Sequence, residues 1–284
     1  MRFIVPFGRD GASDRAARAF ASAWSRPRGS RSVVAIENLP GDGGLRGVER
    51  ANALAACGVP TLLLGTPTTH ILLAARLGAS ASPSSAFAPA IGLGAAPNVL
   101  LAAASLGVGS VPDLVDLARR MPLTYASAGL GQTIHVCSAL FCEQAGIRMR
   151  HRAYDGGSAS AYAGLTEGTV QVYFDSLLGC RERIEARIVV PLAVSFAVRC
   201  DALPDTPTLR ECGYPHALGV WLAVFAANDA IAEPDAEALA NDARFRADLS
   251  RLGLTGGPKC VDLSREIAAC APAWRAALEA SRST

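Results

Sequence analysis

The chain has 284 residues, of which 50% are hydrophobic and 18% are charged, and its formal net charge is +2. This length can bury one large core or two modest ones. The low charged fraction and the scattered basic residues exclude a disordered acidic tail and an electrostatic nucleic-acid binder.

The first hundred residues alternate between strand-like and helix-like patterns. Strands are predicted at Phe3–Phe7, Ser32–Asn38 and Thr61–Leu64, and two more within Ala90–Ala104, broken at Pro97 and Asn98. Helices are predicted at Asp14–Trp24 and Leu45–Ala56. Thr66, Thr68 and His70 follow the third strand, at the kind of carboxyl end where open α/β sheets bind ligands.

No charged residue lies between Arg76 and Asp113, and this absence raises the alternative of a membrane segment. Pro83, Pro89 and Pro97 break the stretch into pieces shorter than the roughly 20 apolar residues that a span requires. Buried strands and loops are therefore the preferred interpretation.

The second half of the chain continues the alternation. A helix begins after the capping hydroxyl of Ser110 and ends before Pro122. Further strands are predicted at His151–Tyr154, Val170–Phe174 and Val220–Ala226, and helices at Ser158–Glu167, around Ala236–Leu252 and at Leu263–Ala280. A strand, a turn and a helix are also predicted within Ile188–Gly213. This rhythm predicts an α/β fold with largely parallel sheets.

The segment Thr124–His135, TYASAGLGQTIH, predicts a strand, a glycine-containing turn and the start of a helix. Gly129 and Gly131 permit backbone angles that a side chain forbids, and Thr133 supplies a hydroxyl near the helix start. We expect free backbone N–H groups to point out of this turn. Since a helix N-terminus carries about half a positive charge, the turn predicts a site for a small anion.

The same arrangement occurs at the start of the chain, in RFIVPFGRDGASDRAARAF. A hydroxyl residue follows the last glycine by two positions in both loops: Ser13 after Gly11, and Thr133 after Gly131. Two anion-binding turns in separate parts of a chain of this length predict two lobes that face one ligand.

The eight cysteines form no C-x-x-C motif and no Cys/His pair with zinc-ligand spacing, so neither a metal nor a cofactor is expected. Most are interpreted as small core residues, and a pair such as Cys200 and Cys212 could be oxidised if the compartment allows it.

An enzyme is the alternative that the polar residues raise. His70, His135 and Asp175, with Ser13 or Ser127, could supply a base, an orienting group and a nucleophile. The chain contains no G-x-S-x-G, H-E-x-x-H or Walker A pattern, and catalysis is therefore disfavoured.

Eight segments together carry a family resemblance. They are IVPFGRDGASD, VVAIENLPGDGG, TLLLGTPTTH, FAPAIGLGAAPNVL, LTYASAGLGQTIH, the AYDGG turn, VQVYFDS and ALPDTPTLRECGYP. In order and near spacing they resemble the tripartite tricarboxylate transporter receptors, the Bordetella uptake gene (Bug) family of solute-binding proteins. The resemblance covers nearly the whole chain.

The resemblance implies a two-lobe α/β fold of the periplasmic-binding-protein class II type, with mostly parallel sheets flanked by helices. Lobe 1 would comprise residues 1–100 and 222–284, and lobe 2 residues 101–221, with the ligand cleft between them. It implies a monomeric periplasmic protein, with no enzyme activity, that delivers a small organic carboxylate to membrane permease subunits. No signal peptide is visible, because the chain opens on a predicted strand. A ligand-sensing or regulatory protein without a transport partner is the alternative.

Position by position, the resemblance implies a ligand site built from both loops and from residues beside them. These residues are Phe7, Gly8, Gly11, Ala12, Ser13, Asp14, Thr66, Thr68, Ser127, Ala128, Gly129, Gly131, Gln132, Thr133, His135, Tyr154, Gly156 and Asp175. We expect Asp175 to meet the far end of the ligand, which ranks amino acids, hydroxy acids and aromatic monocarboxylates above citrate.

Two positions depart from the family pattern. Asp10 stands where the family usually has a glycine, and Asp155 replaces the usual lysine after Tyr154. Either these carboxylates bias the pocket away from the commonest ligands or they face solvent, as exposed charges usually do.

Overall fold

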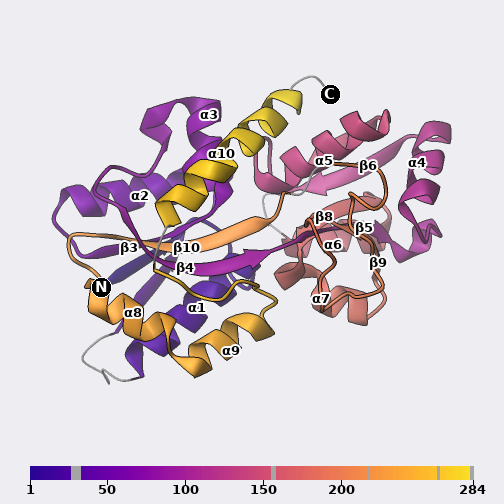
Figure 1. The fold of residues 1–284 in the computed structure, drawn as a ribbon. Helices are drawn as coiled ribbons and strands as arrows, with labels where there is room; N and C mark the ends of the chain where they lie inside the picture. The colour runs from indigo at the N-terminus through magenta and orange to yellow at the C-terminus, as the bar shows by residue number, and fades with distance from the viewer. Residues whose placement is uncertain (27–32, 155–157, 216–217, 261–262, 282–284) are drawn as a thin grey trace. The chain divides into compact units, whose positions relative to one another are not determined.

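The computed structural model describes residues 1–26, 33–154, 158–215, 218–260 and 263–281 (Figure 1). The chain divides into two compact units: unit 1 is Met1–Ala95 with Trp221–Pro272, and unit 2 is Ala96–Val220 with Ala273–Thr284. It passes from one unit to the other three times, and the third passage lies inside helix α10 (Leu263–Ala280), which contains Pro272. The division expected from sequence has only two passages, because an unbroken helical pattern gives no sign that a helix is shared.

Unit 1 contains a five-stranded mixed sheet in the order β2-β1-β3-β10-β4. The strands are β1 (Arg2–Val5), β2 (Ala35–Asn38), β3 (Thr61–Gly65), β4 (Ala88–Ala96) and β10 (Val220–Ala227). Strand β1 pairs in parallel with β2 and β3, and β10 pairs antiparallel to β3. The carboxyl ends of β1, β2 and β3 therefore lie at the same edge of this sheet.

Helices cover both faces of the unit 1 sheet (Figure 1). They are α1 (Ala12–Ser25), α2 (Leu45–Ala56), α3 (Leu73–Leu77), α8 (Glu233–Ala240) and α9 (Ala243–Arg251), with short turns η2 (Asp42–Gly44), η3 (Thr68–Leu72) and η4 (Ala79–Ala81). Phe20 of α1 packs between Phe3 of β1 and Phe245 of α9, with ring centroids 5.4 and 6.3 Å away. This apolar stack fixes the position of α1, whose first turn follows the first glycine loop.

Unit 2 contains a second five-stranded mixed sheet in the order β7-β6-β8-β5-β9. Its elements are β5 (Asn98–Ala103), η5 (Ala104–Leu106), α4 (Val111–Arg120), β6 (Leu123–Ser127), α5 (Thr133–Ala145), β7 (Met149–Ala153), α6 (Ser158–Glu167), β8 (Val172–Ser176), α7 (Leu177–Glu185) and β9 (Val189–Val194). Strand β6 pairs in parallel with β7 and β8, whereas β5 runs antiparallel to β8 and β9. The carboxyl ends of β6, β7 and β8 share one edge.

The predicted start of α4 is confirmed, because Ser110 accepts a hydrogen bond from the Asp113 N–H group and α4 ends at Arg120, before Pro122. Three other predictions need correction. The described residues Ser195–Gly213 form bends and turns instead of a helix, in a stretch where Pro204 and Pro207 cannot supply helical N–H donors.

The second correction concerns the segment Ala236–Leu252, which forms two helices rather than one. Asp242 begins α9 as its N-cap and accepts a hydrogen bond from the Phe245 N–H group at 2.6 Å. The third concerns β8, which extends to Ser176 and so contains Asp175. Strand β2 is described from Ala35 onward, and Ser32, the expected first residue, lies outside the described residues.

All eight cysteines are free thiols, including the candidate pair Cys200 and Cys212. No helix among the described residues is long and apolar enough to cross a membrane. Within the same residues, no group of three or more His, Cys, Asp or Glu side chains is placed to hold a metal ion.

Candidate functional site

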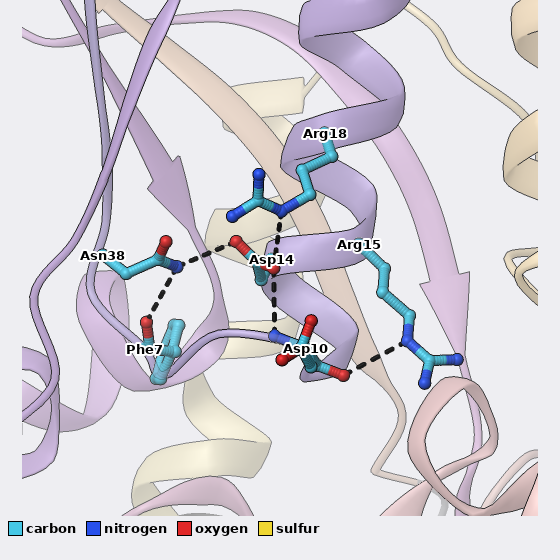
Figure 2. A network of polar contacts seen from close by, with 6 residues as sticks. All are labelled: Phe7, Asp10, Asp14, Arg15, Arg18 and Asn38. Atoms are coloured by element: carbon cyan, nitrogen blue, oxygen red, sulfur yellow. Dashed lines mark hydrogen bonds and ion pairs between the residues drawn. The ribbon is translucent and has the colours of Figure 1, made fainter.

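The first loop joins β1 to α1 and is organised by the buried carboxylate of Asp14 (Figure 2). Its Oδ2 atom accepts hydrogen bonds from the Asp10 N–H group at 3.0 Å and from Arg18 Nε at 2.8 Å. Its Oδ1 atom accepts one from Asn38 Nδ2 at 2.9 Å, and the same amide nitrogen also donates to the Phe7 carbonyl at 3.2 Å. The Asp14 side chain therefore holds both arms of the loop.

Burial alone would raise the pKa of Asp14, but hydrogen bonds from Arg18, the Asp10 amide and Asn38 outweigh burial and lower it. Asp14 is thus ionised near neutral pH. It lies in the first turn of α1, where a carboxylate favourably meets the positive end of the helix. This charge stabilises the loop from inside.

Asp10, where the resemblance predicts a glycine, adopts a φ of +62°, in the left-handed region that favours glycine. Asp is one of the few other residues that visit this region. The Asp10 carbonyl accepts a hydrogen bond from Arg15 Nε at 3.1 Å (Figure 2), and the residue is exposed. The turn at this position therefore has a backbone conformation that glycine adopts most readily.

The α1 helix begins at Ala12, after an N-cap, Gly11, that has no side chain to cap it. The N–H groups of the first helical turn have no partner inside a helix. Ala12 and Ser13 therefore present donors at the carboxyl edge of the unit 1 sheet. Phe7, Gly8 and Gly11 lie in the loop that precedes this turn.

Thr66 and Thr68 follow β3 at the same edge, and both are buried. Thr66 and Thr69 cap each other: the Thr66 N–H group donates to Thr69 Oγ1 at 3.0 Å, and Thr69 Oγ1 donates to the Thr66 carbonyl at 3.1 Å. His70 stacks on Phe225 with ring centroids 3.9 Å apart, and burial lowers the pKa of His70 to about 3. His70 is therefore a neutral packing residue in unit 1.

The second loop joins β6 to α5 in unit 2 and contains two glycines with positive φ, +139° at Gly129 and +69° at Gly131. The Gly129 N–H group donates to Ser127 Oγ at 3.0 Å, and the Gly131 N–H group donates to His135 Nδ1 at 3.3 Å. The expectation of free glycine N–H groups is therefore wrong for these two residues. The side chains that flank the turn take up both donors and hold the loop in shape.

The α5 helix begins at Thr133 after the N-cap Gln132, whose side chain donates to the Ala128 carbonyl at 2.7 Å instead of capping the helix. The first turn of α5 then supplies the N–H donors nearest to the loop. Thr133 and His135 are both buried at this position. The N–H groups of both glycines are thus engaged within the loop, and the first turn of α5 follows the loop directly.

Tyr154 and Asp175 lie near the second loop at the same sheet edge. The Tyr154 N–H group donates to the Ser127 carbonyl at 2.8 Å, which ties the end of β7 to the end of β6. Gly156, also predicted in the site, and Asp155 lie outside the described residues.

Asp175 is only 5% exposed. Its Oδ2 atom accepts a hydrogen bond from Tyr162 Oη at 2.9 Å, and its Oδ1 atom accepts one from the Ser176 N–H group at 2.8 Å. Burial raises the pKa of Asp175 to about 7, although these hydrogen bonds oppose the shift. Gly179 makes room for this carboxyl, since an added Cβ there would lie 2.5 Å from Oδ2. Asp175 is therefore poised to gain or lose a proton near neutral pH.

The structure thus forms two clusters of predicted residues, one at the carboxyl edge of each sheet. Sequence reasoning missed two residues that shape them: Asn38, which holds the first loop, and His151, whose Nε2 atom lies 2.6 Å from Ser127 Oγ. Asn38 is the last residue of β2, and a polar residue at the carboxyl end of a strand could have been recognised from the sequence as a candidate. No feature of the sequence indicates a role for His151, because its contact with Ser127 depends on the pairing of β7 with β6.

The groups proposed for catalysis are engaged separately. His70 contacts Thr69, His135 accepts from Gly131, and Asp175 accepts from Tyr162. Ser127 is 1% exposed and bonded to Gly129. A nucleophile needs both a neighbouring base and access to a substrate, and this serine lacks the second.

Two mixed sheets flanked by helices, each with a strand-to-helix loop at its carboxyl edge, define the class of two-unit solute-binding proteins. The comparisons agree at the level of the family. Residues 17–236 match the model of the tripartite tricarboxylate transporter family receptor, so the chain belongs to this family of receptors, which are not enzymes. The first loop precedes the matched residues, and its assignment rests on the structure.

Curated relatives cover most of the chain. A protein encoded in the tcbD-tcbE intergenic region of Pseudomonas sp. strain P51 is 32% identical over 231 residues, which is 79% of this chain and 67% of the relative. BugT of Bordetella pertussis is 28% identical over 235 residues, 80% of this chain and 70% of the relative.

Solved structures show the same fold. The structure of R. palustris Rpa4515 with adipate is 29% identical, with a TM-score of 0.85, and the match covers 99% of this chain and 96% of that one. The periplasmic binding protein BugD has a TM-score of 0.83 at 22% identity, with coverage of 99% and 97%.

Proposed function

We propose that this chain is a periplasmic receptor that captures a small organic carboxylate and presents it to the permease subunits of a tripartite tricarboxylate-type transporter. The observation that carries the proposal is the pair of strand-to-helix loops, one in each unit, that both lead into a long helix with no side-chain cap. Helix N-termini of this kind bind anions. The relative Rpa4515, whose structure contains adipate, supports a carboxylate as that anion.

We infer that both loops contribute to carboxylate binding. Ala12 and Ser13 would donate from the first loop, and the N–H groups at the start of α5 from the second. Gly8, Gly11, Gly129 and Gly131 would allow the ligand to approach the backbone, with Thr66, Thr68 and Tyr154 beside it. A neutral sugar would leave such donors unpaired, at about 1–3 kcal/mol for each buried one.

Asp175 would face the far end of the ligand. In its ionised form it favours a hydrogen-bond donor there, such as an amine or a hydroxyl group. With a pKa of about 7 it also holds a proton in part of the population, and this proton could be shared with a second carboxylate. The ligand ranking therefore keeps amino acids, hydroxy acids and aromatic monocarboxylates above citrate, and it admits dicarboxylates at mildly acidic pH.

Calorimetry and thermal shift on the purified chain test this function, with glutamate, malate, adipate, benzoate, citrate and glucose as probes. A carboxylate at a hundredfold excess over its Kd would stabilise the protein by about 2.7 kcal/mol. Binding of at least one carboxylate and not of glucose is expected. Exclusive binding of glucose would reject the anion site.

The alternative, a ligand-sensing protein without a transport partner, predicts the same binding but no transport. A gene pair for permease subunits beside this gene, and ligand uptake that requires both this chain and those subunits in reconstituted vesicles, would support the receptor. A sensor kinase gene in that place and no stimulation of uptake would favour the alternative. Sedimentation with and without ligand tests the proposed monomeric state.

A further inference from the structure

Three rings from three elements of unit 2 pack together beside the second loop. Tyr125 of β6, His135 of α5 and His151 of β7 lie with ring centroids 4.7 Å apart for the two histidines and 5.1 Å apart for Tyr125 and His151. The parallel pairing of β6 with β7 places His151 directly beside Tyr125. From there its Nε2 atom lies 2.6 Å from Oγ of Ser127, two residues further along β6.

The Ser127 hydroxyl group connects these rings, through His151, to Gly129 in the turn. Its oxygen accepts the Gly129 N–H group at 3.0 Å and also lies 3.2 Å from the Gly129 carbonyl. A hydroxyl group has one proton and two acceptor positions. If the proton goes to the Gly129 carbonyl, His151 Nε2–H donates to the remaining acceptor position; if it goes to His151, the ring nitrogen accepts it. In both arrangements His151 completes the hydrogen bonds of Ser127.

We propose that His151 is a positioning residue of the ligand site: through the Ser127 hydroxyl group it holds Gly129 in the conformation that shapes the second loop for its ligand. The inference rests on the proposed function, and His151 itself touches no ligand. Gly129 has a φ of +139°, which side-chain-bearing residues rarely adopt, so its orientation depends on the partners that fix its N–H and carbonyl groups. Ser127 Oγ accepts the N–H group and lies 3.2 Å from the carbonyl, which also accepts a hydrogen bond from the Gln132 N–H group at 3.4 Å.

Each of the two histidines is connected to a different glycine of the second loop. His135 accepts the Gly131 N–H group directly, whereas His151 acts on Gly129 through Ser127. This division makes the inference separable from a general loss of packing. Loss of the ring contact between His151 and His135 would act on Gly131, whereas loss of the bond between His151 and Ser127 acts on Gly129.

The test compares two variants of His151, one variant of Ser127 and one control. His151→Leu removes the polar partner, and His151→Gln keeps an amide group that can reach Ser127 Oγ. Arg150→Gln is the matched control, because Arg150 is the exposed neighbour of His151 on β7 and adjacent side chains of a strand point to opposite faces. Ser127→Ala removes the intermediate hydroxyl group and serves if His151→Leu does not fold.

Amide hydrogen exchange measured by NMR follows the stability of the hydrogen bonds in the loop. Calorimetry with glutamate, malate and adipate measures the Kd of the ligand site. In His151→Leu we expect exchange at Gly129 to accelerate about tenfold while Gly131 changes little, and Kd to rise about tenfold, as for one lost hydrogen bond. His151→Gln should recover most of both changes, and Arg150→Gln should show neither. Adding His151→Leu to Ser127→Ala should cause little further change, since the two share one contact.

Unchanged exchange at Gly129 in His151→Leu, or equal losses in the leucine and glutamine variants, would overturn the inference. Failure of the wild-type chain to bind any of the probes would instead reject the proposed function, and with it the role of His151 in binding. The exchange measurement needs no ligand, so it decides separately whether His151 stabilises the conformation of Gly129.

Discussion

The side-chain amide nitrogen of Asn38 lies 2.9 Å from Oδ1 of Asp14 and joins the end of β2 to the first turn of α1. The same nitrogen holds the Phe7 carbonyl on the other arm of the first loop. One amide thus connects three segments at the carboxyl edge of the unit 1 sheet (Figure 2).

Asn38→Ala is expected to lower the free energy of unfolding by about 1–3 kcal/mol, because two acceptors lose their donor and one of them is a buried carboxylate. Carboxylate affinity should fall with it, since the loop loses a tether. Denaturant unfolding and calorimetry measure the two effects. A variant with wild-type stability and affinity would show that Asn38 does not hold the loop.

Asp10 supplies a backbone test. Asp10→Gly should leave stability nearly unchanged, whereas Asp10→Ala should be about 1 kcal/mol less stable than the glycine variant, because alanine tolerates a φ of +62° poorly. Both variants keep the N–H group that donates to Asp14 and both remove the exposed charge. A difference between them in urea unfolding therefore isolates the backbone effect, and equal stability would contradict it.

Gly131 and Gly146 form a matched pair, with φ values of +69° in the second loop and +60° at the end of α5. Alanine at either position should cost about 1–2 kcal/mol of stability for the left-handed conformation. Only Gly131→Ala should also weaken carboxylate binding, and a bulkier Gly131→Val should weaken it more than any cysteine or histidine substitution does. Equal Kd values for Gly131→Ala and Gly146→Ala would exclude a role of this turn in binding.

Asp175 predicts a pH dependence of stability. Its pKa is about 7 in the folded chain against an ordinary value of 3.8, so between these values the folded state binds more protons than the unfolded state. Stability therefore falls as pH rises through this window, and the loss is complete above the folded pKa. Asp14, whose pKa is lowered, acts with the opposite sign at more acidic pH.

Asp175→Asn should remove this contribution, a change on the order of 2 kcal/mol between pH 5 and pH 8. Thermal unfolding of both proteins across that range measures it, and the difference between the two curves cancels the histidines that titrate in both. Parallel curves would mean that Asp175 keeps its ordinary pKa.

Local patterns in the sequence determined most of the elements and the two loops. Helical spacing after Gly11 and after Gly131 predicted α1 and α5, and Ser110 with Pro122 predicted both ends of α4, because caps and breakers act within one turn of chain. The same reasoning failed for Ser195–Gly213, where an apparent helical pattern contains two prolines. It also failed at Asp242, whose side chain starts a new helix within a continuous pattern.

The tertiary structure alone decided how the loops are held. The contacts of Asn38 with Asp14 and of His151 with Ser127 join residues 24 positions apart in the chain, and each depends on which strands become neighbours. The raised pKa of Asp175 likewise follows from its burial in the folded unit, whereas the N–H groups of Gly129 and Gly131 donate to Ser127 and His135, two and four positions away in the chain. Residue types and spacing determine where a turn forms, whereas contacts between residues of different strands depend on distances that only the folded sheets establish.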